Sequence, residues 1–133
     1  WVRRIWMLEK LGVVCVRERV PLRSGGVFDA DAVSPDGKLV ATISTSGSKT
    51  SGGKHAVGKM LKIRSDMYFL LLATADRRIV VLTEQDMYEH CLKERVGGRV
   101  PEEIEFMLSE IPVELRARLV SARQVASGEF GSK

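Results

Sequence analysis

Hydrophobic and polar positions along the chain alternate between helical and extended spacing. Hydrophobic residues between positions 2 and 11 recur at helical spacing with basic residues between them, which predicts an amphipathic helix. Gly12 is placed to end that helix, because glycine accepts the left-handed conformation of a helix C-terminus. The β-branched run that starts at Val13 predicts a strand that continues toward Leu22.

Two further strands are predicted over residues 27–34 and 39–46. Between them, Pro35-Asp36-Gly37 has the composition of a tight turn, because proline presets φ and glycine accepts a positive φ. A loop this short makes the two strands antiparallel neighbours.

A polar loop over residues 47–53 separates these strands from a long helix, which starts near Lys54 or His55 and ends near Leu72. The run Ile79–Leu82 is continuously apolar, as is typical of a central strand covered on both faces. Helical spacing marks the inner face of the long helix as Val57, Met60, Leu61, Arg64, Tyr68 and Leu71.

The last third of the chain is predicted to be helical. Thr83, with Asp86 three residues later, starts one helix, and Gly97-Gly98 ends it. Pro101-Glu102-Glu103 opens another helix, which Ile111-Pro112 breaks, and a final helix follows over residues 113–127. The order of elements predicts an α/β domain with a mixed sheet of about four strands flanked by helices.

Length and composition fit one globular domain, expected over residues 1–128 with a tail at 129–133. The chain has 133 residues, of which 44% are hydrophobic and 29% are charged. No signal peptide is recognisable, and no apolar run approaches the ~20 residues that span a bilayer. Cys15 and Cys91 lack the spacing of a zinc site, so buried reduced thiols in a cytoplasmic protein without membrane contact are expected. The first residue, Trp1, suggests part of a larger chain.

One stretch resembles a known nuclease superfamily. Gly25-Gly26 precedes Asp29-Ala30-Asp31-Ala32-Val33, and the following turn leads into Leu39-Val40-Ala41. Together with the order of elements over residues 2–83, these motifs resemble the core of the PD-(D/E)xK superfamily, which includes restriction endonucleases and Holliday junction resolvases. The resemblance implies a restriction-endonuclease-like three-layer sandwich, with Asp31 at the position of the family's metal-binding aspartate.

Asp29 lies two residues before Asp31, and side chains at this spacing on a strand point the same way. The two carboxylates would then share a metal ion, and hard oxygen ligands favour Mg²⁺. In an active site of this kind the cation activates water and stabilises the charge on the phosphate. The alternative is that both aspartates are solvent-facing residues of an edge strand.

The chain departs from the family on the next strand. Where the family has Glu-x-Lys, the sequence reads Thr42-Ile43-Ser44 or, one step on, Ser44-Thr45-Ser46, and hydroxyls replace neither a carboxylate nor an ammonium group. Some relatives place the catalytic lysine on the following helix, which makes Lys59 and Lys62 the candidates to act with Asp31, with Lys54 at the helix start as another. Acids from elsewhere, Glu9 or Glu18, would have to complete the metal site.

The excess of Lys and Arg over Asp and Glu is compatible with a polyanionic binding partner. Lys and Arg number 21 against 17 Asp and Glu, a net charge of +4. The residues expected to contact DNA or another nucleic acid are Lys49 and Lys54 in the loop and Lys59 and Lys62 on the helix. The loop departs from the P-loop pattern, so nucleotide hydrolysis is not expected.

The sequence therefore predicts a nucleic-acid-associated domain of the PD-(D/E)xK fold with a degenerate site, which binds DNA through a basic loop and helix. Two alternatives stay open. One is a divergent Mg²⁺-dependent endonuclease with a rearranged site. The other is a non-enzymatic dimerisation or interaction module, as a homodimer or within a larger chain. Lys62 and Asp66 also have the spacing of an i,i+4 ion pair on a solvated helix face.

Overall fold

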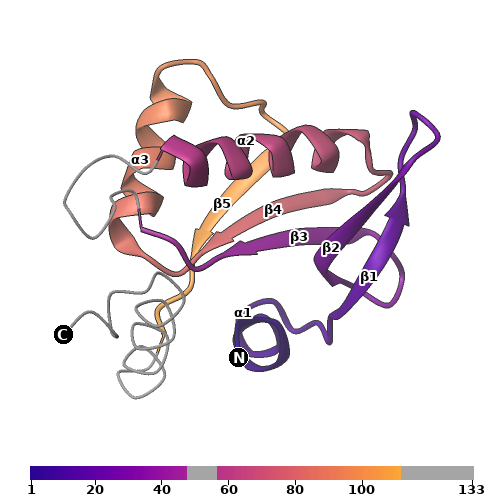
Figure 1. The fold of residues 1–133 in the computed structure, drawn as a ribbon. Coiled ribbons are helices and arrows are strands. Elements are labelled where there is room, and N and C mark those ends of the chain that lie inside the picture. Colours follow the sequence, from indigo (N-terminus) through magenta and orange to yellow (C-terminus); the bar gives the residue numbers. More distant parts are fainter. Residues whose placement is uncertain (48–56, 112–133) are drawn as a thin grey trace, which may run out of the picture.

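The strands lie in one sheet in the order in which they occur in the chain (Figure 1). The computed structural model describes residues 1–47 and 57–111. In chain order its elements are η1 (Val2–Trp6, a π-helical turn), α1 (Met7–Leu11), β1 (Val16–Pro21), β2 (Val27–Val33), β3 (Leu39–Ser44), α2 (Val57–Leu72), β4 (Arg77–Leu82), α3 (Gln85–Val96) and β5 (Ile104–Leu108).

The sheet is mixed. β1, β2 and β3 pair antiparallel, whereas β3, β4 and β5 pair parallel. The predicted hairpin is confirmed: Ser34 N–H donates to the Leu39 carbonyl at 3.0 Å, and Gly37 adopts a φ of 72°. The two parallel pairs follow from the connections, because α2 and α3 each carry the chain back to the same end of the sheet.

Helices cover both faces of the sheet, as Figure 1 shows, with α2 and α3 on one face and η1 and α1 on the other. Each face has its own hydrophobic cluster. In β4, Val80 and Leu82 pack toward α2 and α3, while Ile79 and Val81 pack toward η1 and α1. This confirms the expected mixed α/β class and the prediction that the apolar run in β4 is covered on both faces.

The N-terminal segment behaves largely as predicted. The helix ends at Gly12, whose φ is 67°, and Trp6 is buried in the sheet–helix core. The following strand begins at Val16 rather than at Val13. Cys15 and Cys91 are buried free thiols, also as predicted, and burial together with Glu94 raises the pKa of Cys91 to about 11.

The predicted inner face of α2 is wrong. Leu61, Arg64 and Tyr68 are exposed, although Met60 is buried as expected. Apolar residues occur all round this helix, so more than one stripe has helical spacing, and the sheet beneath selects one of them. The buried stripe consists of Met60, Ile63, Asp66, Met67 and Leu70.

The predicted helix over residues 101–111 is also wrong. Glu102 and Glu103 form a turn, and residues 104–108 become β5, which pairs parallel with β4. The described residues therefore form a five-stranded sheet, where about four strands were expected. Apolar residues alternate through Ile104, Phe106 and Leu108, and pairing with the exposed edge of β4 outweighed the helix-starting signal of Pro101.

Several predictions fall outside the described residues. These are most of the loop predicted at 47–53, the predicted start of the long helix at Lys54 or His55, the last helix over 113–127 and the tail at 129–133. Within residues 1–47 and 57–111, no helix has the length and apolar character needed to cross a membrane.

Candidate functional site

An irregularity in β2 separates the two aspartates on which the metal-site prediction depends. Ala30 packs in the cluster under α2, whereas Ala32 packs in the cluster under η1, so strict alternation breaks between them. The register with β1 shifts at the same point. An extra residue in one strand turns neighbouring side chains to the same side. Asp31 consequently faces α2 and Asp29 faces the opposite side, and the prediction that both point the same way is wrong.

Asp29 is neutralised by the neighbouring strand β1. The Arg17 guanidinium donates two hydrogen bonds to the Asp29 carboxylate, from Nε to Oδ1 at 3.2 Å and from Nη2 to Oδ2 at 2.7 Å. Both side chains are exposed. The hydrogen bonds from Arg17, with the nearby charge of Arg19, lower the pKa of Asp29. This bidentate pair occupies both carboxylate oxygens, so Asp29 is a surface ion-pair partner of Arg17 in the structure.

Asp31 lies where β2 and β3 separate. The two strands pair at Ala32–Ala41 and Val33–Val40. Beyond that point the Asp31 carboxylate replaces a backbone acceptor of β2: its Oδ2 accepts a hydrogen bond from Ile43 N–H at 2.8 Å. From the other face of the sheet, Arg3 Nη1 donates to the Asp31 carbonyl at 3.4 Å. Asp31 is thus held in place by its own carboxylate and by its backbone.

The second acid at this opening is Asp66, which comes from α2. The whole Asp66 residue is 7% exposed. Lys62 Nζ donates to its Oδ1 at 2.6 Å, which confirms the predicted i,i+4 pair. Burial raises the pKa of the Asp66 carboxyl, Lys62 lowers it in part, and the charge of Asp31 raises it again. The carboxylates of Asp31 and Asp66 therefore lie within electrostatic range of each other, and Asp66 is not on the solvated face that the alternative interpretation predicted.

Thr42 is the third polar group on this side of the sheet. Leu39, Ala41 and Ile43 pack toward η1 and α1, and alternation along β3 directs Thr42 toward α2. Thr42 follows Ala41, the register partner of Ala32, so it lies next to Asp31 across the two strands. Thr42 is 2% exposed, and its Oγ1 has no hydrogen-bond partner within the described ranges.

The lysines predicted for the site divide into two groups. Lys59 and Lys62 lie on the first turns of α2, where both are exposed, and Lys62 reaches the buried acid. Lys49 and Lys54 lie outside the described residues. The acids proposed to complete the site, Glu9 and Glu18, are exposed on other elements; the acid that approaches Asp31 is Asp66.

Sequence reasoning missed Asp66 as a site residue, because the helix was predicted to be buried along another stripe. The signal in the sequence that could have identified Asp66 is an acid among the apolar residues of a long helix, since carboxylates are rarely buried without a partner. The groups on this side of the sheet, the carboxylates of Asp31 and Asp66 and the hydroxyl of Thr42, are all oxygen-bearing.

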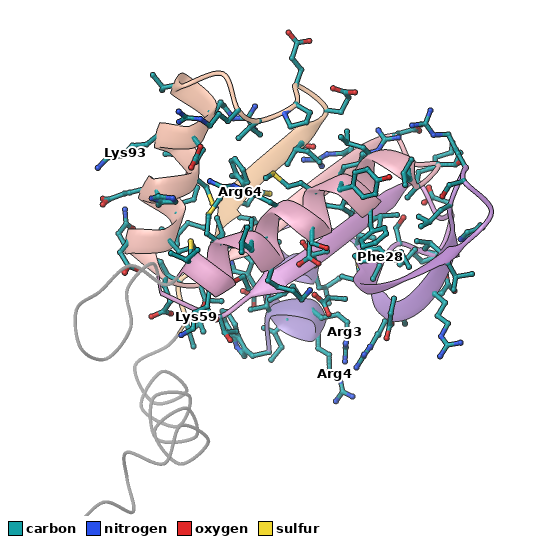
Figure 2. The ribbon with its side chains drawn as sticks, turned by 45° about the horizontal axis from the view of Figure 1, so that its top comes forward. Arg3, Arg4, Phe28, Lys59, Arg64 and Lys93 are labelled. Atoms are coloured by element: carbon teal, nitrogen blue, oxygen red, sulfur yellow. The ribbon has the colours of Figure 1, made fainter. Side chains whose placement is uncertain are left out.

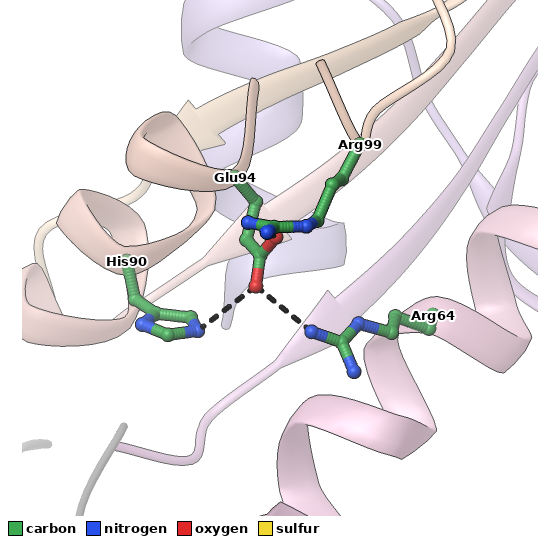
Figure 3. Close-up of polar contacts among 4 residues, drawn as sticks. All are labelled: Arg64, His90, Glu94 and Arg99. Carbon is green, nitrogen blue, oxygen red and sulfur yellow. Dashed lines mark hydrogen bonds and ion pairs between the residues drawn. The ribbon is translucent and has the colours of Figure 1, made fainter. Parts of the chain in front are cut away.

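A second buried carboxylate, Glu94 on α3, has very different surroundings (Figure 3). Arg64 of α2 donates to its Oε1 at 2.8 Å, Arg99 Nη1 lies 3.5 Å from Oε2, and His90 Nε2 lies 3.6 Å from Oε1. Burial raises the pKa of Glu94, but Arg64, Arg99 and His90 outweigh it, so the net shift is downward. This cluster joins α2 to α3.

No cluster of three or more His, Cys, Asp and Glu side chains suited to a metal ion occurs in the described part of the chain. The opening between β2 and β3 thus offers two acids, not three. Comparison with known proteins adds no further constraint: no family model, curated protein or solved structure matches the chain.

Proposed function

We propose that this chain is a nucleic-acid-binding domain with the architecture of the PD-(D/E)xK nucleases, whose degenerate site holds a phosphate backbone. The observation that supports the proposal is the set of cations around the opening between β2 and β3. Arg3 donates to the Asp31 carbonyl from η1, Lys62 reaches Asp66 from α2, and Arg17 on β1 binds Asp29, two residues before Asp31.

The positive side chains at this opening come from both faces of the sheet. Figure 2 shows Arg3 and Arg4 projecting from the N-terminal helix, with Lys59 at the start of α2 on the same side of the molecule. Arg4 and Lys59 are exposed. Cations arranged along an edge, rather than around one point, suit a polymer of phosphates.

Binding without cleavage is the function that this residue set supports best. Thr42 and Ser44 occupy the positions of the family's catalytic Glu and Lys, and their hydroxyls neither neutralise a dication nor stabilise an attacking hydroxide. The partner we propose is duplex DNA, recognised through its backbone. Recognition of this kind gives affinity that falls steeply with salt and depends little on sequence.

The test is the affinity of the chain for a fluorescently labelled DNA duplex, measured by anisotropy across a salt series in EDTA. The double variant Arg4→Ala/Lys59→Ala should bind more weakly and lower the slope of log K against log[salt] by about 0.9 for each lost phosphate contact. Lys93→Ala is the matched control, because this exposed lysine lies on α3, away from the opening (Figure 2). Equal losses in the double variant and the control would contradict the proposal.

Metal-dependent cleavage is the second candidate, and Asp66 is the observation that favours it. Asp66 supplies the acid that β3 lacks, and Lys62 places an ammonium group beside it at 2.6 Å. Incubation of labelled duplex with Mn²⁺ or Mg²⁺ distinguishes the two functions. Cleavage by the native chain that is lost in Asp31→Asn would establish an active, rearranged site, and intact duplex would leave binding as the function.

A further inference from the structure

We infer that the end of α2 carries a second binding site, which takes the phosphate group of a small phosphorylated sugar or polyol. Arg23, Arg78 and Lys38 would hold the phosphate in a hollow of about 460 Å³. This hollow lies where α2 ends and β3 and β4 begin (Figure 1), whereas the opening lies near Ile43, toward the end of β3. The inference is therefore independent of the proposed function.

Two guanidinium groups meet at the end of α2. Arg23 Nη2 donates to the Leu71 carbonyl at 3.0 Å. Arg78, which comes from β4, donates from Nε to the Leu70 carbonyl at 2.8 Å and from Nη2 to the Ala73 carbonyl at 2.9 Å. These bonds bring both groups to one end of the helix and fix their orientation. A ligand would thus meet preorganised donors.

The charge of these two groups is not neutralised by an acid. Among the residues that the structure describes, no carboxylate lies within ion-pair distance of Arg23 or Arg78, whereas the adjacent Arg77 pairs with Glu105 at 2.8 Å. The carbonyl groups at a helix end supply about half an elementary charge. Most N–H donors of both guanidinium groups remain, and their planar geometry matches the oxygens of a phosphate.

The hollow has the size of a small-molecule site. Its volume of about 460 Å³ falls within the roughly 300–1,000 Å³ that is usual for such sites. Lys38 lines it from the β2–β3 turn, and the Lys38 carbonyl accepts hydrogen bonds from Asp76 N–H at 2.8 Å and Arg77 N–H at 3.0 Å. These bonds tie the turn to the segment between α2 and β4, so two walls of the hollow are fixed to each other.

Acids in the lining determine which phosphate compound fits. Asp36, Asp76 and Glu103 also line the hollow, and all are exposed. Asp36 Oδ1 already accepts hydrogen bonds from the Ser34 hydroxyl at 2.6 Å and from Lys38 N–H at 3.0 Å. Carboxylates repel a run of phosphates but accept hydrogen bonds from hydroxyl groups. The lining therefore favours a molecule with one phosphate and several hydroxyls over a polyanion.

The experiment is a calorimetric titration of the full 133-residue chain with D-ribose 5-phosphate as the probe. The native chain should bind ribose 5-phosphate, inorganic phosphate should compete for the site with lower affinity, and ribose should not bind. Nitrogen–proton correlation spectra locate the ligand, and the shifted amide signals should centre on Arg23, Thr74 and Arg78. Absence of binding, equal binding of ribose, or shifts centred elsewhere would overturn the inference.

Arg23→Gln should weaken the binding of ribose 5-phosphate by at least about tenfold, because it removes charge-assisted hydrogen bonds. The backbone bond from Arg23 N–H to the Leu72 carbonyl, at 2.9 Å, survives the substitution, so circular dichroism should match that of the native chain. Arg77→Gln is the matched control, since Arg77 lies outside the lining of the hollow and pairs with Glu105. Equal losses in the two variants would contradict the site.

Glu103→Ala tests the role assigned to the acids. It should weaken the binding of ribose 5-phosphate without weakening that of inorganic phosphate, because it removes an acceptor for hydroxyl groups and not a contact to phosphate. Equal weakening of both ligands would overturn the choice of a sugar or polyol phosphate.

A competition experiment separates this inference from the proposed function. Arg4→Ala/Lys59→Ala should bind ribose 5-phosphate as the native chain does, because neither residue lines the hollow. Its affinity for duplex DNA should fall, so the two sites can fail separately. Displacement of ribose 5-phosphate by the labelled duplex would assign the hollow to nucleic acid and overturn the inference.

Discussion

Two buried carboxylates, Asp66 of α2 and Glu94 of α3, have opposite electrostatic surroundings. Glu94 meets Arg64, His90 and Arg99, and the net effect lowers its pKa. Asp66 meets one lysine and a second aspartate, and burial, together with the charge of Asp31, raises its pKa. Both groups have a similar exposure, because the side chains of Glu94 and Asp66 are each 10% exposed.

The difference separates a structural contact from a candidate site. Around Glu94 the protein supplies cations from two helices, so the carboxylate is fully compensated and connects α2 to α3. Around Asp66 one lysine compensates a buried carboxylate that a second aspartate repels, and on the neighbouring β3 the buried Thr42 hydroxyl has no hydrogen-bond partner in the described ranges. Functional sites keep such unfavourable arrangements because a ligand completes them.

The largest expected effect comes from Glu94. Glu94→Gln should lower the free energy of unfolding by about 1–2 kcal/mol, because it removes charge-assisted hydrogen bonds from a buried position while Arg64 stays partly solvated. Urea denaturation of the variant beside the native chain measures the change. A stability equal to that of the native chain would show that the Glu94 cluster does not join the helices.

Thr42→Val should act in the opposite direction. The variant keeps the side-chain volume and removes a buried hydroxyl that has no hydrogen-bond partner among the described residues, so the protein should gain about 1 kcal/mol of unfolding free energy. Ser109→Ala is the control, since it removes the other buried hydroxyl without a hydrogen-bond partner in the described ranges, away from β3.

Asp66→Asn should raise the free energy of unfolding by a smaller amount, about 0.5 kcal/mol. Neutralising one of two repelling carboxylates should more than offset the loss of the ion pair with Lys62. Thermal denaturation in EDTA and in Mn²⁺ makes the comparison. The native chain should gain stability from Mn²⁺ and the variant should not. A variant less stable than the native chain in EDTA would indicate that Lys62–Asp66 is a structural pair.

The pH dependence of the Glu94 cluster should also be measurable. The pKa of Glu94 lies below its ordinary value of 4.5, so its contribution to stability is present above pH 4.5 and is lost as the pH falls through the lowered native value. The difference in stability between the native chain and Glu94→Gln should therefore shrink below pH 4.5. A constant difference down to acid pH would assign the effect to packing rather than to charge.

The smallest effect is expected at Asp29. Its ion pair with Arg17 is exposed on both sides, and such pairs contribute little to stability. Asp29→Asn should melt at the temperature of the native chain at physiological salt. A clear loss of stability would mean that the ion pair holds β1 to β2.

Sequence patterns were informative where one signal dominated. The β2–β3 hairpin followed from Pro35-Asp36-Gly37, and the doubly covered β4 followed from its unbroken apolar run. Sequence patterns failed where pairing with a distant strand determined whether a segment became helix or strand. β5 forms because the edge of β4 is available, a circumstance that local spacing around Pro101 cannot register.

The site was predictable only in part. Asp31 and Lys62 were singled out, and the structure brings both to one opening. The pairing of Asp31 with Asp29 failed because one irregularity in β2 changes the side on which a residue lies, and sequence does not reveal bulges. Asp66 was missed because several stripes of α2 have helical spacing and only the sheet selects among them.

The coincidence of strand order with chain order has a consequence for synthesis. Each strand pairs only with strands adjacent to it in the chain, so the sheet can grow in the direction in which the ribosome delivers it. Until residues 104–108 emerge, the apolar edge of β4 has no partner. A nascent chain paused after α3 should therefore be the species most prone to aggregate, and β5 completes the sheet as its last covering strand.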